Sequence, residues 1–260
     1  MSPLHSIVLG IIEGLTEFLP ISSTAHLSLT SQLLGIAQTD FIKTFEIAIQ
    51  SGAMLAVIAI YWRKFLNMEI NKKIITAFLP TAILGFVLYK LIKSYLIGNL
   101  YITLTSLFIG GIILIVFEKY INKKEKTQVS INETDILGLS YKKTALIGLF
   151  QSLAVIPGVS RSAATIVSGR LLGLEKDSVV EFSFLLAVPT ILAASVYDLL
   201  KNYSLFNSDN LGSLSLGFIF SFITAIISIK FFISYINKNS LTSFGIYRIL
   251  IAIIIFISIL

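Results

Sequence analysis

The chain has 260 residues, of which 55% are hydrophobic and only 13% are charged, whereas soluble proteins carry roughly 25% charged residues. This composition predicts a polytopic membrane protein built from long apolar helices. The lack of cysteine excludes disulfides, thiolate catalysis and cysteine-ligated metal clusters, and two histidines are too few for a multi-histidine metal site. The net charge of +6 is explained by basic loops of a membrane protein, and no aromatic–basic pattern indicates nucleic acid binding.

The first apolar region, residues 4–36, is too interrupted to form one membrane span. Its first apolar run ends near Pro20, which stops a helix, and the hydroxyl residues that follow are good helix N-caps. We therefore expect a helix–break–helix hairpin that enters the membrane and returns to the same side. Irregular backbone at that depth is tolerated only against protein or a water-filled cavity.

Ionisable side chains inside this hairpin predict a functional site, because charge at membrane depth is costly. Glu13 and Glu17 are four residues apart and project from one face of a helix. An acidic pair of this kind is usually a solvated helix face, but here the neighbouring residues are apolar. His26 lies on the returning arm of the hairpin, and we expect it to approach both carboxylates.

Six further stretches are long and apolar enough to cross the membrane as helices. They are residues 45–62, 74–93, 99–117, 179–200, 213–236 and 244–260. A charged linker, residues 119–143, follows the third stretch. In the region after it, 144–174, Pro157 and Gly158 interrupt the apolar run, so we expect a second re-entrant hairpin there.

The basic residues of the loops predict the orientation. With both hairpins re-entrant, twelve lysines and arginines fall on one side and four on the other. The twelve are Arg63, Lys64, Lys72, Lys73, Lys119, Lys123, Lys124, Lys126, Lys142, Lys143, Lys176 and Lys238, and the four are Lys43, Lys90, Lys93 and Lys201. Because basic loops face the cytoplasm, the first hairpin is expected to enter from the outer face and the second from the cytoplasm.

The two hairpins also resemble each other in sequence. Residues 10–15 followed by Pro20 and Ser23 parallel residues 148–153 followed by Pro157 and Ser160, at an offset near 138. Opposite entry of two similar hairpins predicts an inverted-topology repeat, in which broken helices meet near the membrane midplane. The predicted fold is all-α, with six full transmembrane helices and two re-entrant hairpins in one integral membrane domain, 1–260. Repeat one is about 1–118, and repeat two is about 144–260.

The tips of the two hairpins carry groups that suit phosphate. The first returning helix begins with Ser22, Ser23 and Thr24, and the second with Ser160, Arg161, Ser162 and Thr165. Helix N-termini bind anions, and a guanidinium grips phosphate at two points. The carboxylates suit either a bridging divalent cation or general acid–base catalysis, and serine or histidine is the candidate nucleophile. The sequence therefore predicts phosphoryl-transfer chemistry in the membrane.

Two motifs resemble the signatures of a known family. They are Glu-Gly-Leu-Thr-Glu-Phe-Leu-Pro-Ile-Ser-Ser-Thr-x-His at 13–26 and Pro-Gly-x-Ser-Arg-Ser-x-x-Thr at 157–165. They resemble those of the undecaprenyl-diphosphatase family of the bacitracin-resistance type. The resemblance implies hydrolysis of undecaprenyl (polyprenyl) diphosphate to the monophosphate and inorganic phosphate, which recycles the lipid carrier for cell-wall polymers. The resemblance also implies that bacitracin competes for that lipid rather than binding the protein, so that the activity confers resistance.

The resemblance also implies a location, a cofactor and residue roles. Members are multi-pass proteins of the cell membrane that depend on Mg²⁺ or Ca²⁺, and their active site is open to the outer face. A homodimer is compatible with the resemblance. By motif, the acidic and metal-binding pair is Glu13 and Glu17, the essential histidine is His26, the candidate nucleophile is Ser23, and the phosphate-binding catalytic pair is Ser160 and Arg161. The hydroxyls of Ser22, Thr24, Ser162 and Thr165 are expected to bind the substrate phosphates. Ala25 and Ala163 stand where glycine is common, and neither change removes a reactive group.

A polyprenyl-phosphate flippase or transporter is the alternative function, because broken helices in inverted repeats are also a transporter architecture. The carboxylates and the histidine beside a serine favour an enzyme, since binding phosphate for transport does not need three proton-active groups.

Overall fold

The computed structural model describes residues 1–96, 98–126, 134–205 and 208–259, and within these ranges the chain is α-helical, with a single isolated β-bridge and no strand. The α-helices are α1 (Pro3–Thr16), α2 (Ser23–Leu33), α3 (Asp40–Tyr61), α4 (Met68–Leu91), α5 (Leu100–Lys126), α6 (Tyr141–Gln151), α7 (Arg161–Leu171), α8 (Lys176–Lys201), α9 (Ser208–Ile236) and α10 (Thr242–Ile259). Short 3₁₀ or π segments occupy Lys64–Leu66, Ile92–Leu96, Ser152–Val155 and Tyr203–Leu205. The predicted all-α class is confirmed.

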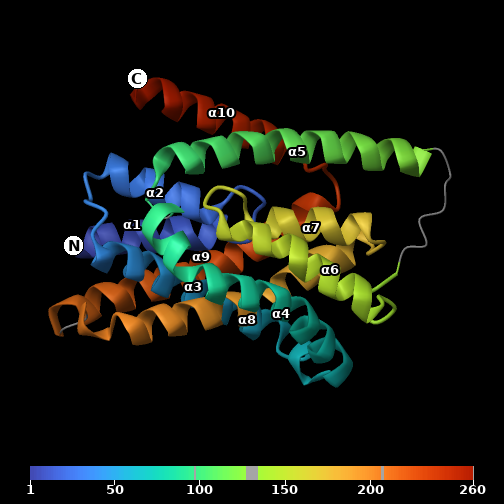
Figure 1. The fold of residues 1–260 in the computed structure, drawn as a ribbon, viewed down its shortest axis with the longest axis horizontal. Helices are drawn as coiled ribbons and strands as arrows, with labels where there is room; N and C mark the ends of the chain where they lie inside the picture. The colour runs from blue at the N-terminus through green and yellow to red at the C-terminus, as the bar shows by residue number, and fades with distance from the viewer. Residues whose placement is uncertain (97, 127–133, 206–207, 260) are drawn as a thin grey trace.

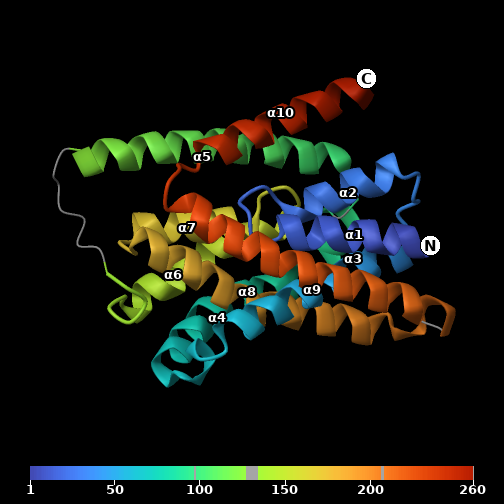
Figure 2. The same cartoon turned by 180° about the vertical axis from the view of Figure 1, so that it is seen from behind.

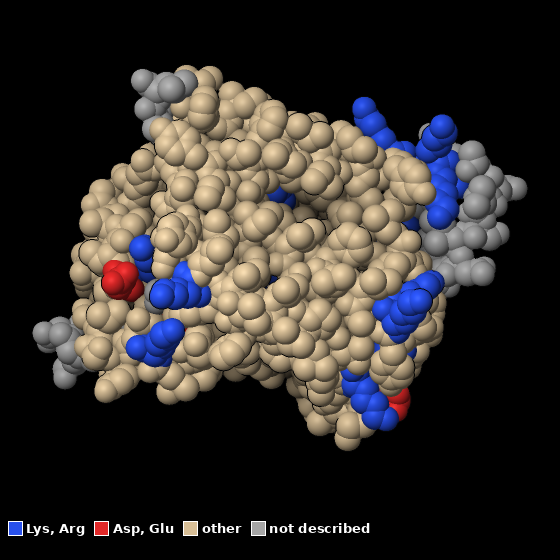
Figure 3. Space-filling model, viewed as in Figure 1, with Lys and Arg blue, Asp and Glu red and all other residues tan. Residues whose placement is uncertain are grey.

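Five helices of the described chain are long and apolar enough to cross a membrane: α3, α4, α5, α8 and α9. The sixth predicted span, α10, falls among the shorter apolar helices over its described residues Thr242–Ile257, so the number of six spans stays a prediction. The long helices run mainly along the longest axis of the molecule (Figure 1). On the face seen in Figure 3, Lys, Arg, Asp and Glu gather at the two ends of that axis, and the broad band between them is uncharged apart from basic atoms inside a central hollow. This distribution is typical of a protein with its middle in lipid.

Both interrupted regions form helix–break–helix hairpins, as predicted. Helices α1 and α2 lie toward the end of the molecule that holds the N-terminus, and α6 and α7 lie toward the opposite end (Figures 1 and 2). The hairpins therefore approach from opposite ends, with their breaks in the middle of the molecule. This arrangement agrees with the re-entrant hairpins expected from the charge count.

The two returning helices begin in the same way. Ser22 is the N-cap of α2 and Ser160 is the N-cap of α7, and both have a φ of 71°, which is uncommon for a residue with a side chain and is found at functional sites. The Ser22 hydroxyl accepts a hydrogen bond from the Ala25 N–H, and the Ser160 hydroxyl accepts one from the Ala163 N–H. The structure thus aligns Ser160 with Ser22 rather than with Ser23, so the register drawn from the sequence is wrong by one residue at this point.

The helices of the two halves pack reciprocally. Helix α1 packs against α9 and α6 packs against α4, while α5 pairs with α10 and α3 with α8. Gly10 and Gly148, which correspond in the repeat, both allow a close approach of the partner helix: a Cβ added at Gly10 would lie 2.4 Å from the Gly217 carbonyl oxygen, and one at Gly148 would lie 1.9 Å from that of Ala77. The inverted repeat stays a prediction that this reciprocal packing supports.

Helix α5 extends further than the sequence predicted. The span was expected to end at 117 and the linker to begin at 119, whereas α5 continues to Lys126. Lysine and glutamate are good helix formers, so the charged segment continues the helix beyond the apolar band. The later part of the linker meets the α7–α8 turn, where the Thr134 N–H donates to the Gly173 carbonyl at 2.9 Å and the Glu175 N–H donates to the Thr134 carbonyl at 3.1 Å.

Candidate active site

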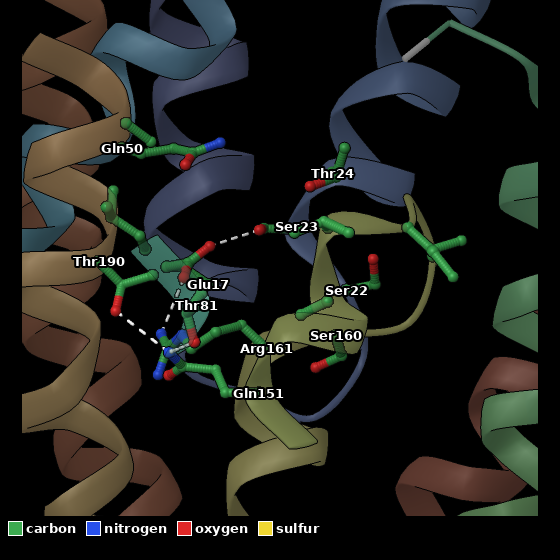
Figure 4. A pocket seen from close by; sticks show the side chains of 16 residues that line it. Glu17, Ser22, Ser23, Thr24, Gln50, Thr81, Gln151, Ser160, Arg161 and Thr190 are labelled. Atoms are coloured by element: carbon green, nitrogen blue, oxygen red, sulfur yellow. Dashed lines mark hydrogen bonds and ion pairs between the residues drawn. The ribbon is translucent and has the colours of Figure 1, made fainter. Parts of the chain in front are cut away.

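A cavity of about 160 Å³ lies where the tips of the two hairpins meet. Six of the ten predicted site residues line it, namely Glu17, Ser22, Ser23, Thr24, Ser160 and Arg161. They come from the end of α1 and from the first turns of α2 and α7, so both hairpins contribute (Figure 4). The fold thus brings residues more than 130 positions apart in the chain to one site.

Glu17 joins the two hairpins at the centre of this cavity. The Ser23 hydroxyl donates to Glu17 Oε2 at 2.5 Å, and Arg161 Nη2 donates to Glu17 Oε1 at 2.8 Å (Figure 4). Both side chains of the ion pair are more than nine-tenths buried. The carboxylate thus accepts a hydrogen bond from the serine hydroxyl on one oxygen and pairs with the guanidinium through the other.

Arg161 is held from a second side and keeps a donor free. Its Nη1 donates to the Ser183 carbonyl at 2.7 Å and to the Ser183 hydroxyl at 3.1 Å. Its buried Nε has no hydrogen-bond partner among the described residues. Since an unpaired buried donor is costly, a ligand oxygen that accepts from Nε would stabilise the site.

Glu13 lies behind Glu17, one helical turn back on α1, and does not line the cavity. The two residues remain in helical relation, because the Glu17 N–H donates to the Glu13 carbonyl at 2.9 Å. Glu13 is fully buried, and neither of its carboxylate oxygens has a hydrogen-bond partner among the described residues. Its charge interacts unfavourably with that of Glu17, and a cation or a shared proton relieves such a pair.

His26 does not face the carboxylates as expected from the sequence. One ring nitrogen, Nδ1, lies 2.8 Å from the Ser22 carbonyl, and the other, Nε2, lies 2.8 Å from the Tyr247 hydroxyl on α10. The His26 and Tyr247 rings are nearly parallel, at 6°, with centroids 5.6 Å apart. Both nitrogens are therefore engaged away from Glu13 and Glu17, and His26 does not line the cavity.

Two of the predicted phosphate-binding hydroxyls also lie outside the cavity lining. The Ser162 hydroxyl donates to the Phe18 carbonyl at 2.9 Å, which ties α7 to the first hairpin. The Thr165 hydroxyl lies 3.0 Å from the Arg161 carbonyl and 3.3 Å from Gln151 Oε1. In this structure both hydroxyls position the hairpins, and their contact with phosphate stays a prediction.

Four polar residues of the cavity wall were not predicted, namely Gln50, Thr81, Gln151 and Thr190. The amide nitrogen of Gln151 donates to the hydroxyls of Thr81 at 2.9 Å and Thr190 at 3.2 Å (Figure 4). The sequence held signals for three of them. Each threonine directly follows a proline within a membrane helix, and Gln151 occupies the place of Glu13 in the internal repeat.

Comparison with known proteins gives one consistent result. The family described as "Bacitracin resistance protein BacA" matches residues 6–254. The chain is 51% identical over 255 residues to "Undecaprenyl-diphosphatase" of Aquifex aeolicus, covering 98% of this chain and 97% of the relative. It is 50% identical to the protein of the same name from Sulfurihydrogenibium, covering 99% of both, and 44% identical to that of Methanococcus aeolicus, covering 98% of both.

These matches extend over almost the whole chain and include both hairpins that form the cavity. The resemblance drawn from the two motifs is therefore confirmed. The chain belongs to the BacA family.

Proposed function

We propose that this chain is a membrane-embedded phosphatase that hydrolyses undecaprenyl diphosphate, or a related polyprenyl diphosphate, to the monophosphate and inorganic phosphate. The relatives that this chain matches over nearly their full length are named for that activity. The monophosphate product is the lipid carrier of cell-wall polymers. The observation that carries the proposal is the contact of Glu17 with both Ser23 and Arg161 inside one cavity between apolar helices. A site that only bound phosphate would not need a carboxylate on the serine hydroxyl.

The geometry assigns a step to each of the three residues. Ser23 Oγ attacks the terminal phosphorus while its proton passes to Glu17, a new O–P bond forms, and the bond to the bridging oxygen breaks. The lipid monophosphate leaves with the electrons of that bond. Water then attacks the phosphoserine, and inorganic phosphate departs as Ser23 recovers its proton. Arg161 stabilises the charge that develops on the transferring group.

The N-termini of α2 and α7 supply the rest of the phosphate grip. Both helices begin at the cavity, and a helix N-terminus presents free N–H groups and the positive end of its dipole to an anion. The free Nε of Arg161 adds a charged donor. A diphosphate thus meets donors from both hairpins.

A divalent cation, Mg²⁺ or Ca²⁺, fits the acidic side of this site. No three carboxylate or imidazole groups converge within the described part of the chain, but Mg²⁺ is commonly held by one or two carboxylates together with substrate phosphates. The orphaned oxygens of Glu13 beside Glu17 are the donors available. When bound, such a cation would neutralise charge on the diphosphate. Glu17 and Ser23 carry the proton transfer.

Phosphate release by the purified chain tests this proposal. We expect release from both farnesyl and undecaprenyl diphosphate, and we expect EDTA to reduce it by at least about tenfold, since a cation contributes several kcal/mol of charge stabilisation. Added Mg²⁺ or Ca²⁺ should restore the rate. Undiminished release in EDTA would remove the cation from the proposal, and no release under any condition would contradict the proposed function.

The active site is proposed to open to the outer face of the cell membrane. Support comes from the basic residues, since the end with the α3–α4 and α5–α6 connections holds most of them and basic loops are cytoplasmic. The first hairpin, which carries Ser23, then enters from outside.

Single cysteines in this cysteine-free chain test the orientation. Leu137 lies in the α5–α6 connection and Tyr203 in the α8–α9 connection, and both are exposed. In intact cells, a membrane-impermeant maleimide should label Tyr203→Cys and leave Leu137→Cys unlabelled until the cells are opened. The reverse pattern would invert the topology.

A further inference from the structure

Arg248 is a fully buried arginine of α10 that the proposed mechanism does not use. Its side chain is 0% exposed, although it lies within an apolar helix. A charge at such a place is costly unless it is compensated. The hydrogen-bond partners that compensate this charge therefore indicate the role of Arg248.

Within the part of the chain that the structure describes, the guanidinium of Arg248 donates to backbone carbonyls alone. Nη1 lies 3.1 Å from the Pro20 and Val159 oxygens, Nη2 lies 2.7 Å from the Gly158 oxygen and 3.3 Å from the Ser106 oxygen, and Nε lies 3.2 Å from the Leu107 oxygen. An arginine has five N–H donors, so the whole donor set is used. Three of these carbonyls belong to the breaks of the two hairpins, and two belong to α5.

We infer that Arg248 is a positioning residue that holds the two hairpin tips in register, and thereby aligns Ser23 with Arg161. Ser23 follows Pro20 by three residues, and Arg161 follows Gly158 by three. The guanidinium of Arg248 therefore binds the backbone three residues before Ser23 and three residues before Arg161. The inference rests on the proposed function, because it assumes that Ser23 and Arg161 act together.

The chemistry of the breaks explains why an arginine is needed there. Carbonyls at a helix break have no helical partner, and at membrane depth an unpaired carbonyl is costly. Because a trans peptide points its N–H opposite to its C=O, holding the Val159 carbonyl directs the Ser160 N–H away from Arg248. Ser160 lines the cavity. A lysine has three donors on a single nitrogen and cannot span five carbonyls from three segments.

Gly110 on α5 provides a second way to disturb the same contacts. A Cβ added there would lie 2.0 Å from Arg248 Nη2 and 2.7 Å from its Cζ. Gly110→Ala therefore has to displace the guanidinium while keeping the arginine in the chain. Gly85→Ala on α4 is the matched control, because a Cβ at Gly85 meets nothing within 4 Å.

The first measurement separates kcat from KM for Arg248→Lys, Gly110→Ala and Gly85→Ala, each purified as monodisperse protein. Misplacement of reacting groups by about 1 Å costs about 10²-fold in rate, so kcat should fall by about 10²-fold in the first two variants. KM should change little, because each tip keeps its own phosphate donors. The control should match the parent chain. A purely structural role for Arg248 would lower the yield of folded protein without lowering kcat per folded molecule.

The second measurement does not depend on activity. Leu33 and Leu171 are exposed and are the last residues of α2 and α7. Spin labels at Leu33→Cys and Leu171→Cys therefore report the distance between the two returning helices. A narrow distance distribution should broaden in Arg248→Lys and in Gly110→Ala. An unchanged distribution would overturn the inference. A broadened distribution with unchanged kcat would also overturn the positioning role. Ser23→Ala, assayed in parallel, tests the proposed function separately.

Discussion

Replacement of Ser23 by alanine is expected to lower kcat by at least about 10³-fold, because it removes the atom that attacks phosphorus. The hydroxyl lies 2.5 Å from Glu17 Oε2, so its proton has an acceptor in place. Substrate binding should remain close to that of the parent chain, since the helix N-termini and Arg161 are untouched. Single-turnover phosphate release with a separate binding measurement distinguishes the two effects.

Ser28→Ala is the matched control for this change, because Ser28 belongs to the same helix, α2, and does not line the cavity. It should retain the parent rate. If Ser23→Ala kept substantial turnover, Ser23 would not be the nucleophile, and a water held by the carboxylates would take that role.

Glu17→Gln is expected to lower kcat by at least about 10²-fold, the usual contribution of a general base. An amide has one acceptor oxygen, whereas Glu17 accepts from both Ser23 and Arg161. In either orientation the amide NH₂ faces one of these donors. The variant therefore loses the proton acceptor or the contact that orients the guanidinium.

Removal of one partner from a buried ion pair also destabilises the fold by about 3–5 kcal/mol, so the rate has to be measured per folded molecule. Glu69→Gln provides the control, because Glu69 forms an exposed pair with Lys72 at 2.7 Å and exposed pairs contribute about 0–1 kcal/mol. Retention of more than about a tenth of the parent rate by folded Glu17→Gln would remove Glu17 from the proton transfer.

The two hairpins could be predicted because their signals are local. Pro20 and Pro157 interrupt apolar runs, and polar residues follow each of them, so composition and helix-breaking chemistry suffice. The meeting of Glu17, Ser23 and Arg161 also followed, since opposed hairpins place their tips together.

The orientation of His26 could not be predicted, because it depends on how α2 is rotated against α10. The sequence places His26 beyond the break but does not show that Tyr247 lies beside it. The role of Arg248 was missed for a related reason. Its partners are backbone carbonyls from three distant segments. Every residue has a backbone carbonyl, so the sequence does not indicate which of them accept hydrogen bonds from a side chain.

The one-residue error in the repeat has a local cause. Matching the prolines aligned Ser23 with Ser160, but the proline precedes the N-cap serine by two residues in the first break and by three in the second. The N-cap serines, Ser22 and Ser160, share the same positive φ and mark the equivalent positions. The equivalent of Ser23 in the second hairpin is therefore Arg161, the first residue of α7. The same structural position thus carries the attacking hydroxyl in one half and the guanidinium in the other.

The central claim is that the two hairpin tips together cleave a lipid diphosphate. The most direct measurement uses undecaprenyl diphosphate labelled in its terminal phosphate, incubated with purified chain in detergent micelles, where no second compartment exists. We predict that the label appears as inorganic phosphate and that the lipid is recovered as unlabelled monophosphate, with both products lost in Ser23→Ala. Label that remains on the lipid, despite folded protein and added divalent cation, would contradict the account and favour a transporter.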